Sequence, residues 1–119
     1  MRDPLIAVVG VCASGKTTLV NALRFHGYRA RQVSQEHSYV PDMWQRITRP
    51  DILIYLDASL EAIRSRRSDG QWPERLRSLQ LERLSFARTH CDFYIWTDGL
   101  SPDEVLQNAL AFLAGFCAA

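Results

Sequence analysis

Eight residues near the start of the chain, Gly10 to Thr17, have the types and spacing that bind phosphate. They read GVCASGKT and match the pattern GxxxxGK[ST]. In this pattern, backbone N–H groups of a loop and of a helix N-terminus point into one concavity, where unsatisfied donors and the helix dipole favour phosphate oxygens. Lys16 adds a positive charge for the β- and γ-phosphates, and the Thr17 hydroxyl adds a ligand for Mg²⁺. The segment predicts a site for a nucleoside triphosphate with Mg²⁺.

The lysine of this loop is unusual in the chain. Of the 14 basic residues, 13 are arginine, and the only lysine is Lys16. It stands at the one position where the phosphate pattern requires lysine. The residues predicted to contact the nucleotide are Gly10, Cys12, Ala13, Ser14, Gly15, Lys16, Thr17 and Thr18.

A strand must end where this loop begins, and a helix must start where it ends. Residues 5–9 form a short apolar run, LIAVV, typical of a strand buried on both faces of a parallel sheet. From residue 16 to about residue 26 the apolar positions recur at helical spacing, and Gly27 stands where a C-terminal cap is expected. This order of strand, loop and helix is the context that the pattern demands.

Further strands and helices alternate along the rest of the chain. Strands are predicted at 28–34, with the alternation of a sheet edge, and at 52–56 and 93–96. Helices are predicted near 42–47, at 59–67, at 73–89, and after a capping box at Ser101 to Glu104. The alternation predicts an α/β fold with three layers, α/β/α, around a mainly parallel four-stranded sheet, in one domain over residues 1–119. Ligands of such sheets bind beyond the carboxyl ends of the strands.

Four segments resemble the P-loop kinases of small molecules, the group that holds nucleoside and nucleotide kinases, shikimate kinase and dephospho-coenzyme A kinase. They are the phosphate loop, RPDILIYLDAS at 49–59, the arginines after it, and CDFYIWTDGLSPDEV at 91–105. The resemblance implies the P-loop NTPase fold and ATP-dependent phosphoryl transfer, with Mg²⁺, to a small hydroxyl- or phosphate-bearing acceptor. Lys16 would be a catalytic residue. The chain is shorter than these kinases, which carry a fifth strand and a fuller lid.

Two carboxylates compete for the metal and the base roles in this resemblance. Asp57 ends an apolar strand as a Walker B aspartate does, which makes it a candidate magnesium ligand. In the kinases it resembles, however, this strand often closes with an acidic residue that has a structural role. Glu36 follows the second strand, where deoxynucleoside kinases place a catalytic base with a tryptophan a few residues later; here Trp44 is eight positions on. Glu36 is a candidate base or magnesium contact, or else a solvated loop residue.

Arginines follow Asp57 where the resembled kinases carry a lid. Lid arginines clamp the transferring phosphoryl group, and Arg66 and Arg67 are the preferred candidates for this role. The segment is very short for a lid. The other interpretation is a solvated helix face in a chain that lacks other lysines.

Two other functions are alternatives to a kinase. The sequence argues against a conventional GTPase, because its guanine-reading motif, Asn-Lys-x-Asp, needs a lysine beyond Lys16, and because no Asp-x-x-Gly occurs in the sequence. A non-enzymatic, regulatory ATP-binding module stays open because the acceptor site would have to be built from residues 35–49 alone.

Composition limits the partners. The chain has 47% hydrophobic and 23% charged residues, typical of a folded domain, and a net charge of +1, which gives no general reason to expect nucleic acid or a membrane surface as partner. Three widely spaced cysteines argue against a disulfide framework and against a zinc knuckle. With no long apolar stretch or leader-like start, the sequence predicts a cytoplasmic protein.

Overall fold

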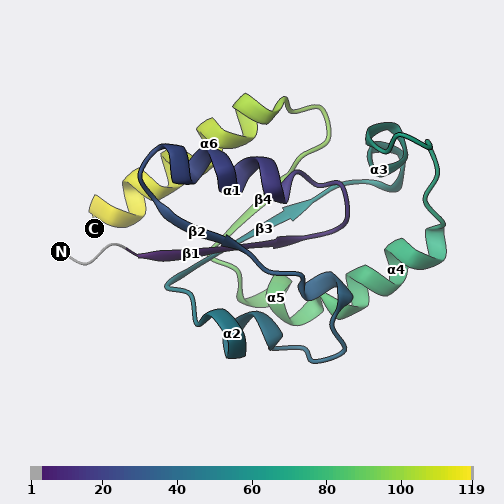
Figure 1. Ribbon diagram of the computed structural model, residues 1–119, viewed down its shortest axis with the longest axis horizontal. Coiled ribbons are helices and arrows are strands. Elements are labelled where there is room, and N and C mark those ends of the chain that lie inside the picture. The colour runs from purple at the N-terminus through teal and green to yellow at the C-terminus, as the bar shows by residue number, and fades with distance from the viewer. Residues whose placement is uncertain (1–3, 119) are drawn as a thin grey trace.

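The centre of the fold is a four-stranded sheet in which all strands run parallel (Figure 1). The computed structural model describes residues 4–118. The strands are β1 (Leu5–Gly10), β2 (Arg29–Gln32), β3 (Ile52–Asp57) and β4 (Phe93–Trp96), and their order in space is β2-β1-β3-β4. The predicted four-stranded parallel sheet is confirmed, and the strand predicted to be an edge, β2, lies at an edge.

The two central strands are apolar on both faces because helices cover both faces of the sheet. α1 (Lys16–Phe25) and α6 (Pro102–Ala118) pack on the face that carries Ile6 and Val8. On the face that carries Ala7 and Val9, the packing comes from α2 (Met43–Thr48), α3 (Leu60–Arg66) and α5 (Ser85–His90). Figure 1 shows α1 and α6 on one side of the sheet and α2 and α5 on the other. This arrangement agrees with the predicted α/β class and is compatible with three layers.

The segment predicted as one helix over 73–89 forms two helices. α4 (Glu74–Arg83) stops at Leu84, whose φ of −93° and ψ of −2° interrupt the chain of helical residues before α5 starts. The break lets Leu84 and Ala87 reach the core, while α4 turns the buried side chain of Gln80 toward the ends of the strands. No glycine or proline lies at this position, so the sequence contains no ordinary helix-breaking signal.

The segment between β2 and α2 holds a short 3-10 helix, η1 (Gln35–His37), where the sequence predicted only a loop. Both predicted N-terminal caps are present. Ser59 Oγ accepts from the backbone N–H of Ala62 at 3.1 Å. Ser101 and Glu104 form the reciprocal capping box, with bonds of 2.9 and 3.1 Å. Within the described part of the chain, no helix has the length and apolar content needed to cross a membrane.

All four strands end at the same edge of the sheet, and the register keeps β1 and β3 very close there. Gly10 pairs with Leu56, and a Cβ atom built on Gly10 would lie 2.1 Å from the Leu56 carbonyl oxygen. Only glycine fits this contact, because the obstacle is backbone that no rotamer change can remove. The loop that follows Gly10 therefore starts at a fixed point, between the ends of β2 and β3.

Candidate functional site

The loop between β1 and α1 makes a tight turn at the carboxyl edge of the sheet. Ala13 and Gly15 have positive φ angles of 58° and 99°, and α1 begins directly afterwards at Lys16. Nothing lies within 4 Å of a Cβ built on Gly15, so this side of the loop is open. The first N–H groups of α1 have no partner within the helix and face this edge, as expected for a helix N-terminus.

The Lys16 side chain folds back over the loop instead of extending into solvent. Its Nζ donates to the carbonyl oxygens of Gly10 and Val11, each at 3.0 Å, and lies 2.6 Å from Glu36 Oε2. Lys16 is only 6% exposed and Glu36 only 3%. The structure therefore brings together two of the predicted catalytic residues as a buried ion pair.

Glu36 is held in place by its neighbour in η1. Gln35 is fully buried; its Oε1 accepts from the backbone N–H of Trp44 at 3.0 Å, and its Nε2 donates to the Val40 carbonyl oxygen at 2.9 Å. One carboxylate oxygen of Glu36 bonds Lys16. The other, Oε1, is buried and has no hydrogen-bond partner among the described residues. Glu36 is thus a buried carboxylate rather than the solvated loop residue that was the alternative interpretation.

Two hydroxyl groups of the loop lie in contrasting surroundings. Thr17 Oγ1 donates to Gln32 Oε1, at the end of β2, over 2.6 Å. Ser14 Oγ is buried, and no residue between 4 and 118 gives it a hydrogen bond. Buried polar atoms without partners are rare in folded proteins and often mark the place of a ligand or a water molecule.

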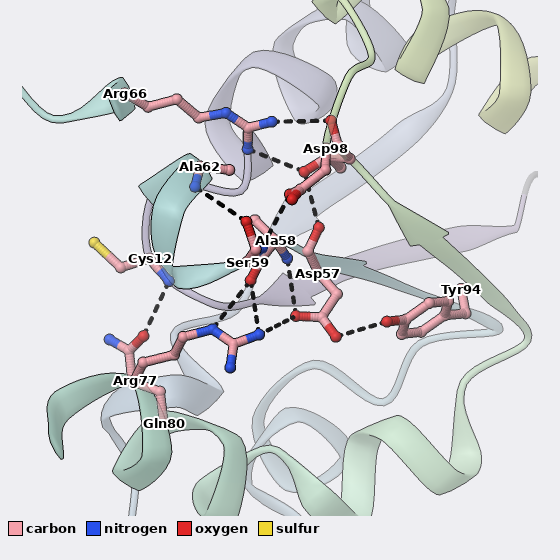
Figure 2. A network of polar contacts seen from close by, with 11 residues as sticks. Cys12, Asp57, Ala58, Ser59, Ala62, Arg66, Arg77, Gln80, Tyr94 and Asp98 are labelled. Atoms are coloured by element: carbon pink, nitrogen blue, oxygen red, sulfur yellow. Dashed lines mark hydrogen bonds and ion pairs between the residues drawn. The ribbon is translucent and has the colours of Figure 1, made fainter. Parts of the chain in front are cut away.

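Asp57 lies at the end of β3, and both of its carboxylate oxygens are engaged (Figure 2). Oδ2 accepts from the Tyr94 hydroxyl at 2.6 Å, and Oδ1 accepts from the backbone N–H of Ala58 at 2.8 Å and lies 3.9 Å from Arg77 Nη2. Burial, together with the hydrogen bond to Asp57, raises the pKa of Tyr94 to about 12. These contacts are those of a carboxylate that ties β3 to β4 and α4. Its predicted role as a magnesium ligand remains a prediction.

A pocket of about 310 Å³ lies beside the loop, on the side of α1 and α6. Arg66 lines it, and its guanidinium donates to the Ala13 carbonyl oxygen at 3.0 Å, to Thr97 Oγ1 at 3.0 Å and to the Thr97 carbonyl oxygen at 2.9 Å. The walls combine loop residues, polar groups and apolar side chains, namely Ala13, Ser14, Gly15, Thr18, Arg66, Thr97, Leu19, Leu100, Pro102 and Val105.

The other preferred lid arginine lies elsewhere. Arg67 packs its guanidinium over the Trp72 ring, 4.6 Å from the centroid, and pairs with Asp69 at 3.3 Å. Its closest approach to the loop is the 3.7 Å contact between Nη1 and Cys12 Sγ. Of the two arginines, only Arg66 lines the pocket.

Sequence reasoning missed the polar face of α4. Arg77, Gln80 and Arg83 each bond a backbone group that follows a different strand. Arg77 Nη2 donates to the Ala58 carbonyl oxygen at 2.9 Å, and Gln80 Oε1 accepts from Cys12 N–H at 3.1 Å. Arg83 Nη1 donates to the Glu36 carbonyl oxygen at 3.5 Å. The spacing of three residues between these side chains could have indicated a shared helix face.

No protein-family model and no curated protein matches this chain. Within residues 4–118, no group of three or more histidine, cysteine, aspartate or glutamate side chains is arranged to hold a metal ion.

Proposed function

We propose that the chain is a P-loop protein of the NTPase fold class that binds ATP with Mg²⁺ and transfers phosphate to a small hydroxyl- or phosphate-bearing acceptor. The observation that carries the proposal is the geometry of residues 10–17. The only lysine of the chain is folded over a turn with positive φ angles, at the start of a helix and at the carboxyl edge of a parallel sheet. These are the surroundings in which a GxxxxGK[ST] loop binds phosphate.

The side chains around the loop fit a magnesium nucleotide. Ser14 Oγ and Glu36 Oε1 are buried polar atoms without partners among the described residues. Thr17, the residue after Lys16, is exposed, and its hydroxyl bonds Gln32. Thr17 and Glu36 would hold the metal. When bound, Mg²⁺ neutralises charge on the transferred phosphoryl group. Glu36 is the better placed of the two candidate carboxylates, because the oxygens of Asp57 are already bonded by Tyr94 and Ala58.

The pocket beside the loop fits the base of the nucleotide. It adjoins Gly15 and Thr18 at the start of α1, and its walls are largely apolar, as expected for a site that takes a flat aromatic ring. Arg66 would lie against that ring or against the phosphates. The proposal of ATP rather than GTP rests on the sequence, which has no Asn-Lys-x-Asp motif to read guanine.

The second candidate function is an ATP-binding module without catalysis. One observation favours it: on the side of the loop away from the pocket, the polar face of α4 is bonded to the ends of three strands, through Arg77, Gln80 and Arg83. An acceptor molecule on that side would have to displace these contacts. A kinase must therefore move α4, whereas a binding module need not.

Calorimetric titration with ATP and Mg²⁺ tests nucleotide binding. We expect Lys16→Ala to lose measurable binding, because the β- and γ-phosphates lose their only lysine partner. Asn21→Ala, at an exposed position on the same helix and outside the pocket, is the matched control and should bind as the wild type does. Circular dichroism would establish that both variants are folded at the temperature used. Unchanged ATP affinity in Lys16→Ala would refute the proposal.

A separate assay distinguishes the two candidate functions. ATP consumption by the wild type would be measured with a panel of small alcohols, nucleosides and phosphorylated metabolites. Stimulation by one acceptor class would support the phosphotransferase. Binding of ATP with no stimulation by any acceptor would favour the module.

A further inference from the structure

We infer that Glu36 makes the site select metal-bound polyphosphate over metal-free polyphosphate, by occupying Lys16 with a negative charge that only a cation can compensate once phosphate has bound. The inference rests on the proposed function, since it concerns which form of the nucleotide the same loop accepts. The ion pair between Lys16 and Glu36 is itself present in the structure, so it can also be tested without a nucleotide.

The ammonium group of Lys16 is saturated. An ammonium has three N–H donors, and three acceptors lie within 3.0 Å of Nζ: the carbonyl oxygens of Gly10 and Val11 and the carboxylate of Glu36. An incoming phosphate oxygen must replace one of them. The two carbonyls belong to the strand end and the loop, so the Glu36 carboxylate is the contact that phosphate replaces.

Glu36 has little freedom to leave after the exchange. It is 3% exposed, and its backbone lies in η1, where Gln35 is bonded to Trp44 and Val40. Its own carbonyl oxygen accepts from Arg83. The carboxylate would therefore stay close to the phosphate that displaced it, with Oε1 still unpartnered among the described residues.

The Glu36 carboxylate and a phosphate group next to it in this buried site would repel each other strongly. The His37 imidazole also lies near the carboxylate, with Nε2 3.9 Å from Oε2, but its side chain is 62% exposed, so solvent weakens its effect. A divalent cation between the carboxylate and the phosphates would compensate both groups. Thr17 follows Lys16 directly and supplies the hydroxyl ligand. Metal-free nucleotide lacks this compensation.

The test compares affinity with and without metal, using a slowly hydrolysed ATP analogue, adenylyl imidodiphosphate, in Mg²⁺ or in EDTA. For the wild type we expect binding at least tenfold weaker in EDTA. In Glu36→Gln, whose amide has the same shape but no charge, the two affinities should agree within about threefold, through tighter metal-free binding. Glu61→Gln, which removes an exposed carboxylate on α3, should keep the wild-type ratio.

Three results would overturn the inference. One is a wild-type ratio below about threefold. Another is a Glu36→Gln variant that keeps the full ratio or loses affinity for both forms; if that variant does not fold, Glu36→Ala is held to the same criterion. The third is a wild type that binds the analogue in neither condition, and only this result also removes the proposed function.

The ion pair can also be tested without any ligand. Because Lys16 is the only lysine, protein labelled with ¹⁵N-lysine gives a single side-chain ammonium signal. We expect this signal to be protected from exchange with water in the wild type and in Glu61→Gln, and to shift and exchange faster in Glu36→Gln. A signal that exchanges freely in the wild type would show that the ion pair does not form, whatever the chain binds.

Discussion

The ends of β2 and β3 flank the glycine loop on its two sides, and each is followed or closed by a buried carboxylate. Asp57, at the end of β3, uses both oxygens on Tyr94, Ala58 and Arg77. Glu36, after β2, uses one oxygen on Lys16 and leaves the other without a partner among the described residues. Both residues are about equally buried, at 2% and 3% exposed. The two carboxylates therefore lie in similar positions, but both oxygens of Asp57 have partners and, within the described part of the chain, only one oxygen of Glu36 does.

This difference separates a carboxylate that stabilises the fold from one that is available to a ligand. A fully bonded buried carboxylate lowers the free energy of the folded chain, and moving it would break several contacts. A partly bonded one leaves a buried acceptor unsatisfied, which natural proteins tolerate mainly where function requires it. We therefore expect substitutions at the β2 end to affect both stability and binding, and substitutions at the β3 end to affect stability with little change in binding.

The largest effect is expected from breaking the ion pair at the β2 end. Lys16→Ala leaves Glu36 buried without its counter-charge, and should lower the free energy of unfolding by about 3 kcal/mol. Adding Glu36→Gln should restore about 2 kcal/mol of this loss, because the remaining buried group is then neutral. Urea denaturation of the two single variants and the double variant measures the coupling. Additive effects would show that the two side chains do not interact in solution.

At the β3 end, Asp57→Asn should lower the free energy of unfolding by about 2 kcal/mol, because an amide replaces one acceptor oxygen in a buried set of hydrogen bonds. Affinity for magnesium nucleotide should stay within about threefold of the wild type. Denaturation and calorimetry on the same preparation check both expectations. A tenfold loss of affinity at unchanged stability would instead identify Asp57 as the metal ligand.

The smallest effect concerns Tyr94, the partner of Asp57. Tyr94→Phe should lower the free energy of unfolding by about 1 kcal/mol at pH 8, since it removes one hydrogen bond from a partly exposed side chain. The folded chain raises the pKa of this phenol from 10.0 to about 12. Its contribution to stability is therefore complete below pH 10 and is lost as the pH rises toward 12. Unfolding free energies measured from pH 8 to 11.5 should converge for the two proteins. A difference in unfolding free energy that stays constant across this range would show that ionisation of Tyr94 does not affect stability as expected.

Much of the fold follows from patterns within single elements. The apolar runs of β1 and β3, the cap at Ser59 and the capping box at Ser101 are local signals, and the structure contains all four of these features. The break at Leu84 was missed because tertiary packing produces it: Leu84 and Ala87 face the core, while Gln80 bonds the loop after β1. No glycine or proline at the break indicates it in the sequence.

The candidate site likewise has a part that a local pattern predicts and a part that depends on the fold. Residues 10–17 could be predicted as a phosphate site because the pattern is contiguous in the sequence. The partnership of Lys16 with Glu36 joins residues 20 positions apart, and the contacts of Asp57 with Tyr94 join residues 37 apart. Sequence alone could name both carboxylates but left their roles open, because what each one touches depends on the order of the strands. Arg66 and Arg67 are adjacent, yet only the fold distinguishes the one at the pocket from the one on Trp72.

The close approach of Gly10 to Leu56 affects how mutational data on this chain are interpreted. A side chain at position 10 would collide with the backbone of β3 whether or not a ligand is bound. Intolerance of substitution there reports on the spacing of two strands, although the residue is the first of the proposed phosphate-binding pattern. Gly15 is the opposite case: its surroundings are open, so a side chain there meets only the backbone strain of a positive φ angle and any molecule that the loop holds. Substitution at Gly10 and at Gly15 can therefore be harmful for unrelated reasons.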